Sequence, residues 1–185
     1  MSDVLEFVFW GRGGEGAKTA SHVLAEAAFI EGKNVQAFPE YGPERSGAPM
    51  RAFVKISEGK IPDQSMIVNP NYIVFIDGSL LSLQELNSQI FQYANKDTKF
   101  FINSKEQVKL ENNYESICLD ASSIAQKYIG KDFVNILMLG AIVKLTKVVK
   151  LESLIEAVKR TLSNKPNLIE ANIKALKEAY NAVNG

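Results

Sequence analysis

The stretch that decides the expected fold is Val4-Leu-Glu-Phe-Val-Phe-Trp-Gly-Arg-Gly-Gly-Glu-Gly-Ala-Lys-Thr-Ala20. It opens with a short apolar run, rich in aromatic and β-branched side chains, which is typical of a buried strand. Four glycines follow within one turn, at Gly11, Gly13, Gly14 and Gly16. Because glycine has no Cβ, the chain can turn sharply there and other groups can approach its backbone closely. We therefore expect a strand, a glycine-rich turn and then a helix.

The helix predicted after this turn covers residues 17–31 and ends at Gly32. Its free N–H groups and the positive end of its dipole would point at the turn, a suitable place for a phosphate or carboxylate. The spacing also matches the G-x-G-x-x-G of dinucleotide-binding turns, and Glu40 is the candidate acidic residue after the second strand. A tight turn without any ligand is the alternative. A Walker A motif is excluded, because Lys18-Thr19 lacks the required glycine spacing.

The rest of the chain predicts alternating strands and helices. Further strands are expected at 34–38, 50–56, 72–76, 99–102 and 116–119, and helices at 80–93, 124–129, 135–147, 151–162 and 167–183. A turn at 57–60 is expected to form a hairpin. This order predicts an α/β fold with three α/β/α layers, a Rossmann-like, mostly parallel sheet and C-terminal helices. Residues 1–185 contain no repeat or linker, so a single domain is expected.

The amino-acid composition limits the classes of function that are expected. The 185 residues include 21 basic and 21 acidic side chains, and this balance argues against a nucleic-acid partner or a membrane surface. No segment is apolar enough to cross a bilayer, and the first residues do not form a signal peptide. A cytoplasmic protein is therefore expected.

Cys118 is the only cysteine and His22 the only histidine. One cysteine cannot form an internal disulfide or supply an iron–sulfur cluster or a structural zinc site. Cys118 is expected to be a small apolar residue on a strand, and His22 a surface or packing residue on the first helix. No catalytic residue and no metal ligand is predicted in this chain.

A second loop, 39–49, carries three prolines and two glycines. Such a loop is stiff and suited to holding side chains in position. In open α/β sheets ligands bind at the carboxyl edge, where this loop and the glycine turn should meet. Arg12, Tyr41, Glu44 and Arg45 are therefore expected to converge on one surface. The alternative is a Glu44–Arg45 pair that only braces the loop.

Both loops resemble those of the gamma subunit of pyruvate (2-oxoacid):ferredoxin oxidoreductase. The matching segments are Gly11-Arg-Gly-Gly-Glu-Gly-Ala-Lys-Thr-Ala20, Gln36-Ala-Phe-Pro-Glu-Tyr-Gly-Pro-Glu-Arg-Ser-Gly-Ala-Pro-Met-Arg-Ala52, Asn69-Pro70, Ile76-Asp77, Leu80-Leu81, Asn135 with Met138-Leu-Gly-Ala141, and Glu170-Ala-Asn-Ile-Lys-Ala-Leu-Lys-Glu-Ala-Tyr180. The resemblance covers almost the whole chain. One departure is Glu15, where the family commonly carries Gln; a donor amide is lost and a negative charge gained.

The resemblance implies a subunit that is not active alone. Complexes of this family oxidise a 2-oxoacid with thiamine diphosphate and magnesium, pass electrons through iron–sulfur clusters to ferredoxin, and release an acyl-CoA. The cofactors would lie on alpha, beta and delta partner chains, none on this chain alone. Pyruvate is the expected substrate; 2-oxoglutarate, branched-chain and aryl 2-oxoacids stay open.

The resemblance also implies that this chain covers the active site and helps to place coenzyme A. Residues expected near coenzyme A or another ligand are Gly11, Arg12, Gly13, Gly14 and Gly16. Residues expected in an active-site or subunit-interface loop are Tyr41, Gly42, Glu44, Arg45 and Gly47. Two other hypotheses are a stand-alone Rossmann-type dehydrogenase, for which His22 is a poor proton donor, and a purely structural interface protein with an empty glycine turn.

Overall fold

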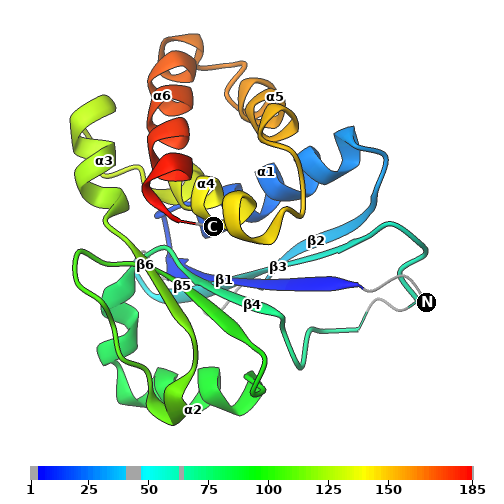
Figure 1. Cartoon of the computed structure of the whole chain (residues 1–185), viewed down its shortest axis with the longest axis vertical. Coiled ribbons are helices and arrows are strands. Elements are labelled where there is room, and N and C mark those ends of the chain that lie inside the picture. The colour runs from blue at the N-terminus through cyan, green and yellow to red at the C-terminus, as the bar shows by residue number, and fades with distance from the viewer. Residues whose placement is uncertain (1–3, 41–46, 63–64, 185) are drawn as a thin grey trace.

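A central six-stranded sheet organises the computed structural model, which describes residues 4–40, 47–62 and 65–184 (Figure 1). The strands are β1 (Leu5–Arg12), β2 (Asn34–Glu40), β3 (Pro49–Ser57), β4 (Tyr72–Phe75), β5 (Lys99–Asn103) and β6 (Ser116–Leu119). Their order across the sheet is β2-β3-β1-β4-β5-β6. Strand β3 runs antiparallel to both of its neighbours, and the remaining pairs are parallel. The predicted mostly parallel sheet is confirmed.

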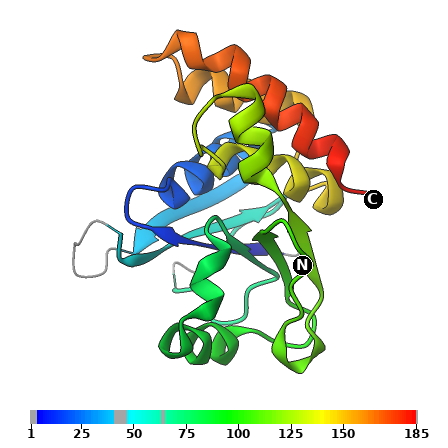
Figure 2. The same ribbon diagram turned by 90° about the vertical axis from the view of Figure 1, so that its left-hand side faces the viewer.

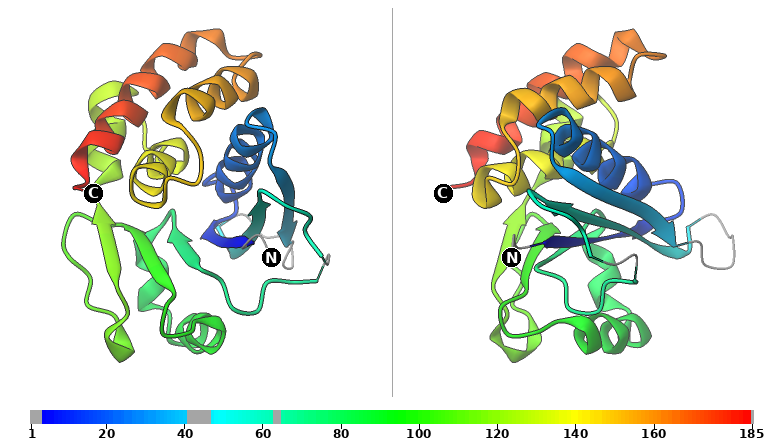
Figure 3. Two further views of the ribbon diagram at one scale, coloured as in Figure 1. Left: turned by 45° about the vertical axis from the view of Figure 1, so that its right-hand side comes forward. Right: turned by 90° about the vertical axis from the view of Figure 1, so that its right-hand side faces the viewer.

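Helices cover both faces of this sheet, so the predicted three layers are also confirmed (Figures 1, 2 and 3). One face carries α1 (Ala17–Ile30), α3 (Ala121–Tyr128), α4 (Asn135–Thr146), α5 (Leu151–Thr161) and α6 (Pro166–Ala182). The other face carries α2 (Gln84–Tyr93) and the short 3-10 helices η1 (Gly78–Ser82) and η2 (Glu111–Asn113). No helix in the described ranges is both long and apolar enough to cross a membrane.

Strand β1 supplies side chains to both cores. Successive side chains of a strand point to opposite faces. Phe7 and Phe9 therefore enter the core under α1 and α4, whereas Val8 and Trp10 enter the core under α2. All four side chains are at most 5% exposed, so β1 is buried on both faces as its apolar run predicts.

The hairpin predicted at 57–60 is wrong. The antiparallel hairpin is formed by β2 and β3, from the pair Asn34↔Ser57 to the pair Glu40↔Arg51. After β3 the chain crosses under the sheet to β4, on the far side of β1, and Ile67 packs in the core under α2 on the way. The physical reason is burial: β3 is buried on both faces over Ala52–Ser57 and most of these side chains are apolar, so it is favoured inside the sheet, between β1 and β2.

Helix α4 is buried almost completely because it packs between the sheet and α6. Its residues from Ile136 to Val143 are all buried. Gly140 lies where the two helices touch: a Cβ at this position would come 2.6 Å from the carbonyl oxygen of Leu176 and 3.0 Å from the amide nitrogen of Tyr180. Both are backbone atoms of α6, so only glycine allows the helices to approach this closely.

Replacing Gly140 by alanine should destabilise the protein. In a helix, alanine is more favourable than glycine by about 1 kcal/mol. Overpacking against a backbone that cannot move costs about 1–3 kcal/mol. Because the clash is with backbone atoms, the cost should lie in the upper part of this range. We therefore expect Gly140→Ala to lower the free energy of unfolding by about 1–2 kcal/mol, measured by urea denaturation. Gln126→Ala, at an exposed position of α3, is the control and should change stability little. An unchanged or raised unfolding midpoint for Gly140→Ala would contradict the packing described.

Candidate functional site

The glycine turn connects the end of β1 to the start of α1. Gly14 has φ +100° and Gly16 has φ +89°, in the left-handed region that favours glycine. Gly11 is needed for a different reason, since a Cβ there would lie 3.3 Å from the Cβ of Ala17. The amide of Glu15 donates to the carbonyl of Arg12 at 3.0 Å and closes the turn.

The second loop meets this turn through backbone hydrogen bonds. Gly13 donates its N–H to the carbonyl of Ala48 at 2.9 Å, and Gly47 donates to the carbonyl of Gly13 at 3.3 Å. Gly47 has φ +83°. The structure thus brings Gly47 against the glycine turn, as expected for two loops at the carboxyl edge. Four predicted residues, Tyr41, Gly42, Glu44 and Arg45, lie outside the described residues.

Arg12 is a cation at this edge, and among the described residues its guanidinium binds three groups. Its Nε donates to Oδ2 of Asp77 at 2.7 Å. Its two terminal nitrogens donate to the hydroxyl of Ser79 at 3.2 Å and to the carbonyl of Gly47 at 3.3 Å. The Arg12 side chain is 32% exposed, so it remains accessible from solvent while holding the ends of β1 and β4 and the second loop together.

Asp77 is held in its ionised form. Burial raises the pKa of this carboxyl, but hydrogen bonds from the hydroxyl and amide of Ser79 and from Arg12 outweigh burial and lower the pKa below the ordinary 3.8. The amide bond of Ser79, of 2.9 Å, also caps η1, and its hydroxyl donates to the other carboxylate oxygen at 2.8 Å. Gly78 lies next to this cap and against the end of β5, where a Cβ would clash with the carbonyl oxygen of Asn103.

Arg12 and Asp77 flank a switch point of the sheet. After β1 the chain passes to α1 on one face, and after β4 it passes to η1 and α2 on the other. Where neighbouring strands send their connections to opposite faces, a crevice forms outside their carboxyl ends, and open α/β folds bind ligands there. We refer to the part of the carboxyl edge bordered by the glycine turn, Arg12, Asp77 and Ser79 as the β1–β4 crevice, after its place at this switch point.

Helix α1 adds a positive end to this crevice. Its N-cap residue is Gly16, no side chain caps it, and no acidic residue lies in its first turn. Asn135, at the start of α4, donates from Nδ2 to the carbonyl of Gly16 at 3.4 Å. This hydrogen bond connects the glycine turn to α4. Uncapped N–H groups and the helix dipole favour an anion at this place.

Glu15 lies across the same turn. Its Oε2 accepts a hydrogen bond from the backbone N–H of Arg12 at 2.6 Å. The residue as a whole is exposed, but its carboxyl is partly desolvated against the turn, and this is the main reason that its pKa is raised above the ordinary 4.5. The backbone hydrogen bond of Arg12 opposes the rise, and the charges of Asp77 and Asp132 add to it.

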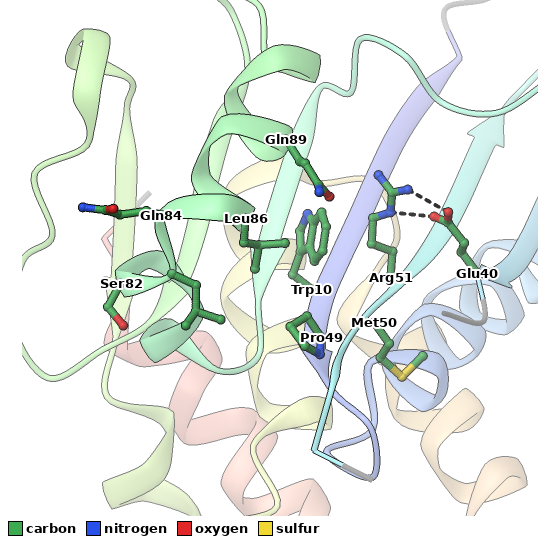
Figure 4. Close-up of a pocket in the computed structure, with 10 residues that line it drawn as sticks. Trp10, Glu40, Pro49, Met50, Arg51, Ser82, Gln84, Leu86 and Gln89 are labelled. Atoms are coloured by element: carbon green, nitrogen blue, oxygen red, sulfur yellow. Dashed lines mark hydrogen bonds and ion pairs between the residues drawn. The ribbon is translucent and has the colours of Figure 1, made fainter. Parts of the chain in front are cut away.

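A cavity of about 960 Å³ lies beside the crevice, between β1, β3 and α2 (Figure 4). Its wall includes Trp10, Met50, Leu83 and Leu86. The guanidinium carbon of Arg51 lies 5.1 Å from the centre of the Trp10 ring. The same side chain binds the carboxylate of Glu40, with Nη2 donating to Oε1 at 2.7 Å. Glu40, the candidate acidic residue of the dinucleotide-binding pattern, is therefore bound by an arginine of β3.

The single histidine and the single cysteine, residue types that are common in catalytic sites, do not border the β1–β4 crevice. His22 is exposed on α1. Cys118 is half-buried on β6, where its Sγ accepts a hydrogen bond from the amide of Val108 at 3.3 Å. Among the described residues no three His, Cys, Asp or Glu side chains form a set that could hold a metal ion.

Comparison with known proteins gives the family. Residues 6–182 match the family described as pyruvate ferredoxin/flavodoxin oxidoreductase. The chain belongs to this family. It is 43% identical to the pyruvate/ketoisovalerate oxidoreductases common subunit gamma of Pyrococcus abyssi, over 96% of both chains. It is 39% identical to the pyruvate synthase subunit PorC of Methanocaldococcus jannaschii, again over 96% of both.

A solved structure extends the likeness to the fold. The pyruvate oxidoreductase subunit PORC of Thermotoga maritima superposes with a TM-score of 0.82 at 37% identity, covering 96% of each chain. The resemblance to a gamma subunit of an oxidoreductase complex is therefore confirmed. The homologues are subunits of pyruvate oxidoreductases, which places this chain in an oxidoreductase complex.

Sequence reasoning missed several residues of the crevice. Asp77 and Ser79 were visible only as polar residues at the end of a buried strand, and nothing in the sequence shows that they bind Arg12. Asn103 was also missed; it accepts a bond from the amide of Ala121 and donates to the carbonyl of Ile76. A useful signal would have been the rule that polar residues directly after parallel strands meet at one edge.

The Arg12–Asp77 pair should stabilise the protein in a pH-dependent way. We expect Asp77→Asn to lower the free energy of unfolding by about 1 kcal/mol at pH 7, the upper range for a partly exposed pair. Because folding lowers the pKa of Asp77 below 3.8, this stabilisation is complete above pH 3.8 and is lost as the pH falls through the folded-state pKa. Urea unfolding of the unmodified protein and of Asp77→Asn, measured at several pH values, should give free energies of unfolding that converge in acid.

Asp97→Asn, at an exposed position before β5, is the matched control. A difference between Asp77→Asn and the unmodified chain that stays constant down to pH 2.5 would show that the charge of Asp77 has no part in it.

Proposed function

We propose that this chain is the gamma subunit of a pyruvate:ferredoxin oxidoreductase and that the β1–β4 crevice helps to place coenzyme A over the active site. The complex would convert pyruvate, coenzyme A and oxidised ferredoxin into acetyl-CoA, CO2 and reduced ferredoxin. The observation that carries the proposal is Arg12, a partly exposed cation at a switch point beside an uncapped helix N-terminus. Coenzyme A carries phosphates that such a place suits.

The residues present do not fit the redox cofactors of the reaction. A single cysteine cannot hold an iron–sulfur cluster, and Cys118 is half-buried on β6. The described residues also offer no set of metal ligands for the magnesium that accompanies thiamine diphosphate. We therefore assign thiamine diphosphate, magnesium and the clusters to alpha, beta and delta partner chains. This chain would bind and orient an anionic substrate, and the proposed place of the complex is the cytoplasm.

The name of one relative supports a second substrate. The Pyrococcus abyssi relative is called a common subunit of pyruvate and ketoisovalerate oxidoreductases. A gamma subunit that contacts coenzyme A, and leaves recognition of the 2-oxoacid side chain to its partners, is suited to such sharing. The second candidate is therefore a gamma subunit shared with a complex for branched-chain 2-oxoacids.

Loss of Arg12 should weaken coenzyme A binding. A charge-assisted hydrogen bond to phosphate contributes about 1.5–3 kcal/mol, so Arg12→Ala should raise KM for coenzyme A in the assembled complex about tenfold or more. The Michaelis constant for pyruvate should change much less. Arg12→Lys, which keeps the charge, should recover part of the affinity.

Arg160→Ala is the matched control, because Arg160 is an exposed residue of α5 that pairs with Glu26 and Glu156. An unchanged KM for coenzyme A in Arg12→Ala would instead support the purely structural hypothesis. Saturable micromolar binding of NADH or FAD by the chain alone would support the stand-alone dehydrogenase.

Anaerobic co-purification tests the assembly. A tagged chain expressed with its natural partners should recover, in equal amounts, a thiamine-diphosphate subunit and a cysteine-rich, ferredoxin-like subunit. The recovered complexes should reduce ferredoxin with pyruvate and, if the subunit is shared, a second complex should do so with 3-methyl-2-oxobutanoate. The isolated chain should have no activity. Recovery of the chain by itself, or turnover by it, would overturn the subunit proposal.

A further inference from the structure

The β1–β4 crevice opens where hydrogen bonding between the two strands ends. The last bond is donated by the amide of Ile76 to the carbonyl of Trp10, at 2.8 Å. Backbone groups of a strand point alternately to its two neighbours, so the next donor of β1 on the β4 side is the N–H of Arg12. Beyond Trp10↔Phe75 the strands no longer pair, and this donor faces the crevice instead of β4.

Glu15 already binds this donor. Its Oε2 lies 2.6 Å from the Arg12 nitrogen, while its own amide donates back to the Arg12 carbonyl at 3.0 Å. The same oxygen lies 3.6 Å from the place that a Cβ on Gly11 would take. The side chain is therefore folded back over its own turn, with a carboxylate among the groups that an anionic ligand would need.

The surroundings do not favour a second negative charge in this place. Arg12 faces Glu15 from β1, but its guanidinium is bound to Asp77. Asp77 faces Glu15 from the end of β4, and Asp132 faces it from the segment before α4. Both carboxylates repel it, and burial and these two charges together raise the pKa of Glu15. A bound phosphate would meet the same three carboxylates unless Glu15 moved.

We propose that the Glu15 carboxylate is a built-in competitor for the anionic ligand of the β1–β4 crevice, and that a ligand phosphate binds there by displacing it from the Arg12 amide. This inference rests on the proposed function, since it takes coenzyme A as the ligand. Glu15 is then a positioning residue that sets the affinity of the turn. Its charge weakens ligand binding at neutral pH, and the effect falls as the pH decreases toward the pKa of Glu15.

The test compares Glu15→Gln with the unmodified subunit in the assembled complex. Glutamine keeps the size of the side chain and an oxygen that can accept the Arg12 bond, but it removes the charge. We expect KM for coenzyme A at pH 7.5 to fall about threefold, the effect of removing one like charge near the surface. The ratio of the two KM values should approach one as the pH is lowered, because protonation removes the same charge from Glu15. Protonation of coenzyme A itself changes both KM values by the same factor, so it does not affect their ratio.

Glu111→Gln is the matched control, since Glu111 is exposed in η2 near the start of β6, at the opposite end of the sheet. In the full-length chain, the NMR signal of the Arg12 amide should move with the titration of Glu15, and this movement should be absent in Glu15→Gln.

The outcomes separate this inference from the proposed function. A lower KM in Glu15→Gln together with a higher KM in Arg12→Ala supports both. A higher KM in Arg12→Ala with no change in Glu15→Gln keeps coenzyme A at the crevice and overturns the competitor role. No change in either variant overturns both. An Arg12 amide signal that does not respond to Glu15 would overturn the hydrogen bond on which the inference depends.

Discussion

The burial of β1 on both faces is the constraint on which the rest of the structure depends. Phe7 and Phe9 are fully buried on one side and Val8 and Trp10 nearly so on the other. A strand with apolar side chains on both faces must have strands beside it and helices above and below it. This requirement places β3 and β4 on its two edges, α1 and α4 over one face, and α2 over the other. The connections that leave β1 and β4 must then diverge to opposite faces, and the crevice between them is a direct consequence.

Polar contacts at the carboxyl edge follow from this divergence. Where β1 and β4 separate, their backbone groups lose each other as partners, and buried or half-buried donors need new ones. Arg12, Asp77 and Ser79 bind one another across the gap, and Glu15 accepts the N–H of Arg12. On the neighbouring strands Asn103 performs the same task, joining the end of β5 to the first turn of α3 and to β4. The edge is thus held by side chains that a ligand can compete with, whereas the strands below it are held by the backbone.

Much of the fold was predictable from local pattern, and less of the site was. Alternating apolar and aromatic residues located β1, β4 and β5, and 3.6-residue periodicity located α4, α5 and α6 to within a few residues. The place of β3 was not predictable in this way, because its mostly apolar run is compatible with more than one place in the sheet, and pairing is decided by burial across the whole sheet. Gly11 and Gly16 could be recognised because the turn needs them for local reasons. Asp77 could not be recognised as the partner of Arg12, since α1, β2, β3 and β4 lie between them in the sequence and only the finished sheet brings them together.

The bonds that Arg12 already makes bear on the proposed role of this chain as one part of a larger coenzyme A site. Among the described residues, three of the five N–H donors of Arg12 are bound by Asp77, Ser79 and Gly47, so a ligand that needs one of these three must exchange with the protein group that holds it. The net binding free energy from such an exchange is smaller than the binding free energy that an unpaired arginine would supply. The reason is that the charge on Asp77 must then be solvated or bound by another donor. High affinity therefore requires further donors that arrive with the ligand. On the proposed function, those donors would come from partner chains of the oxidoreductase complex. Coenzyme A would then bind firmly only after assembly, when water is excluded and the remaining charges are matched.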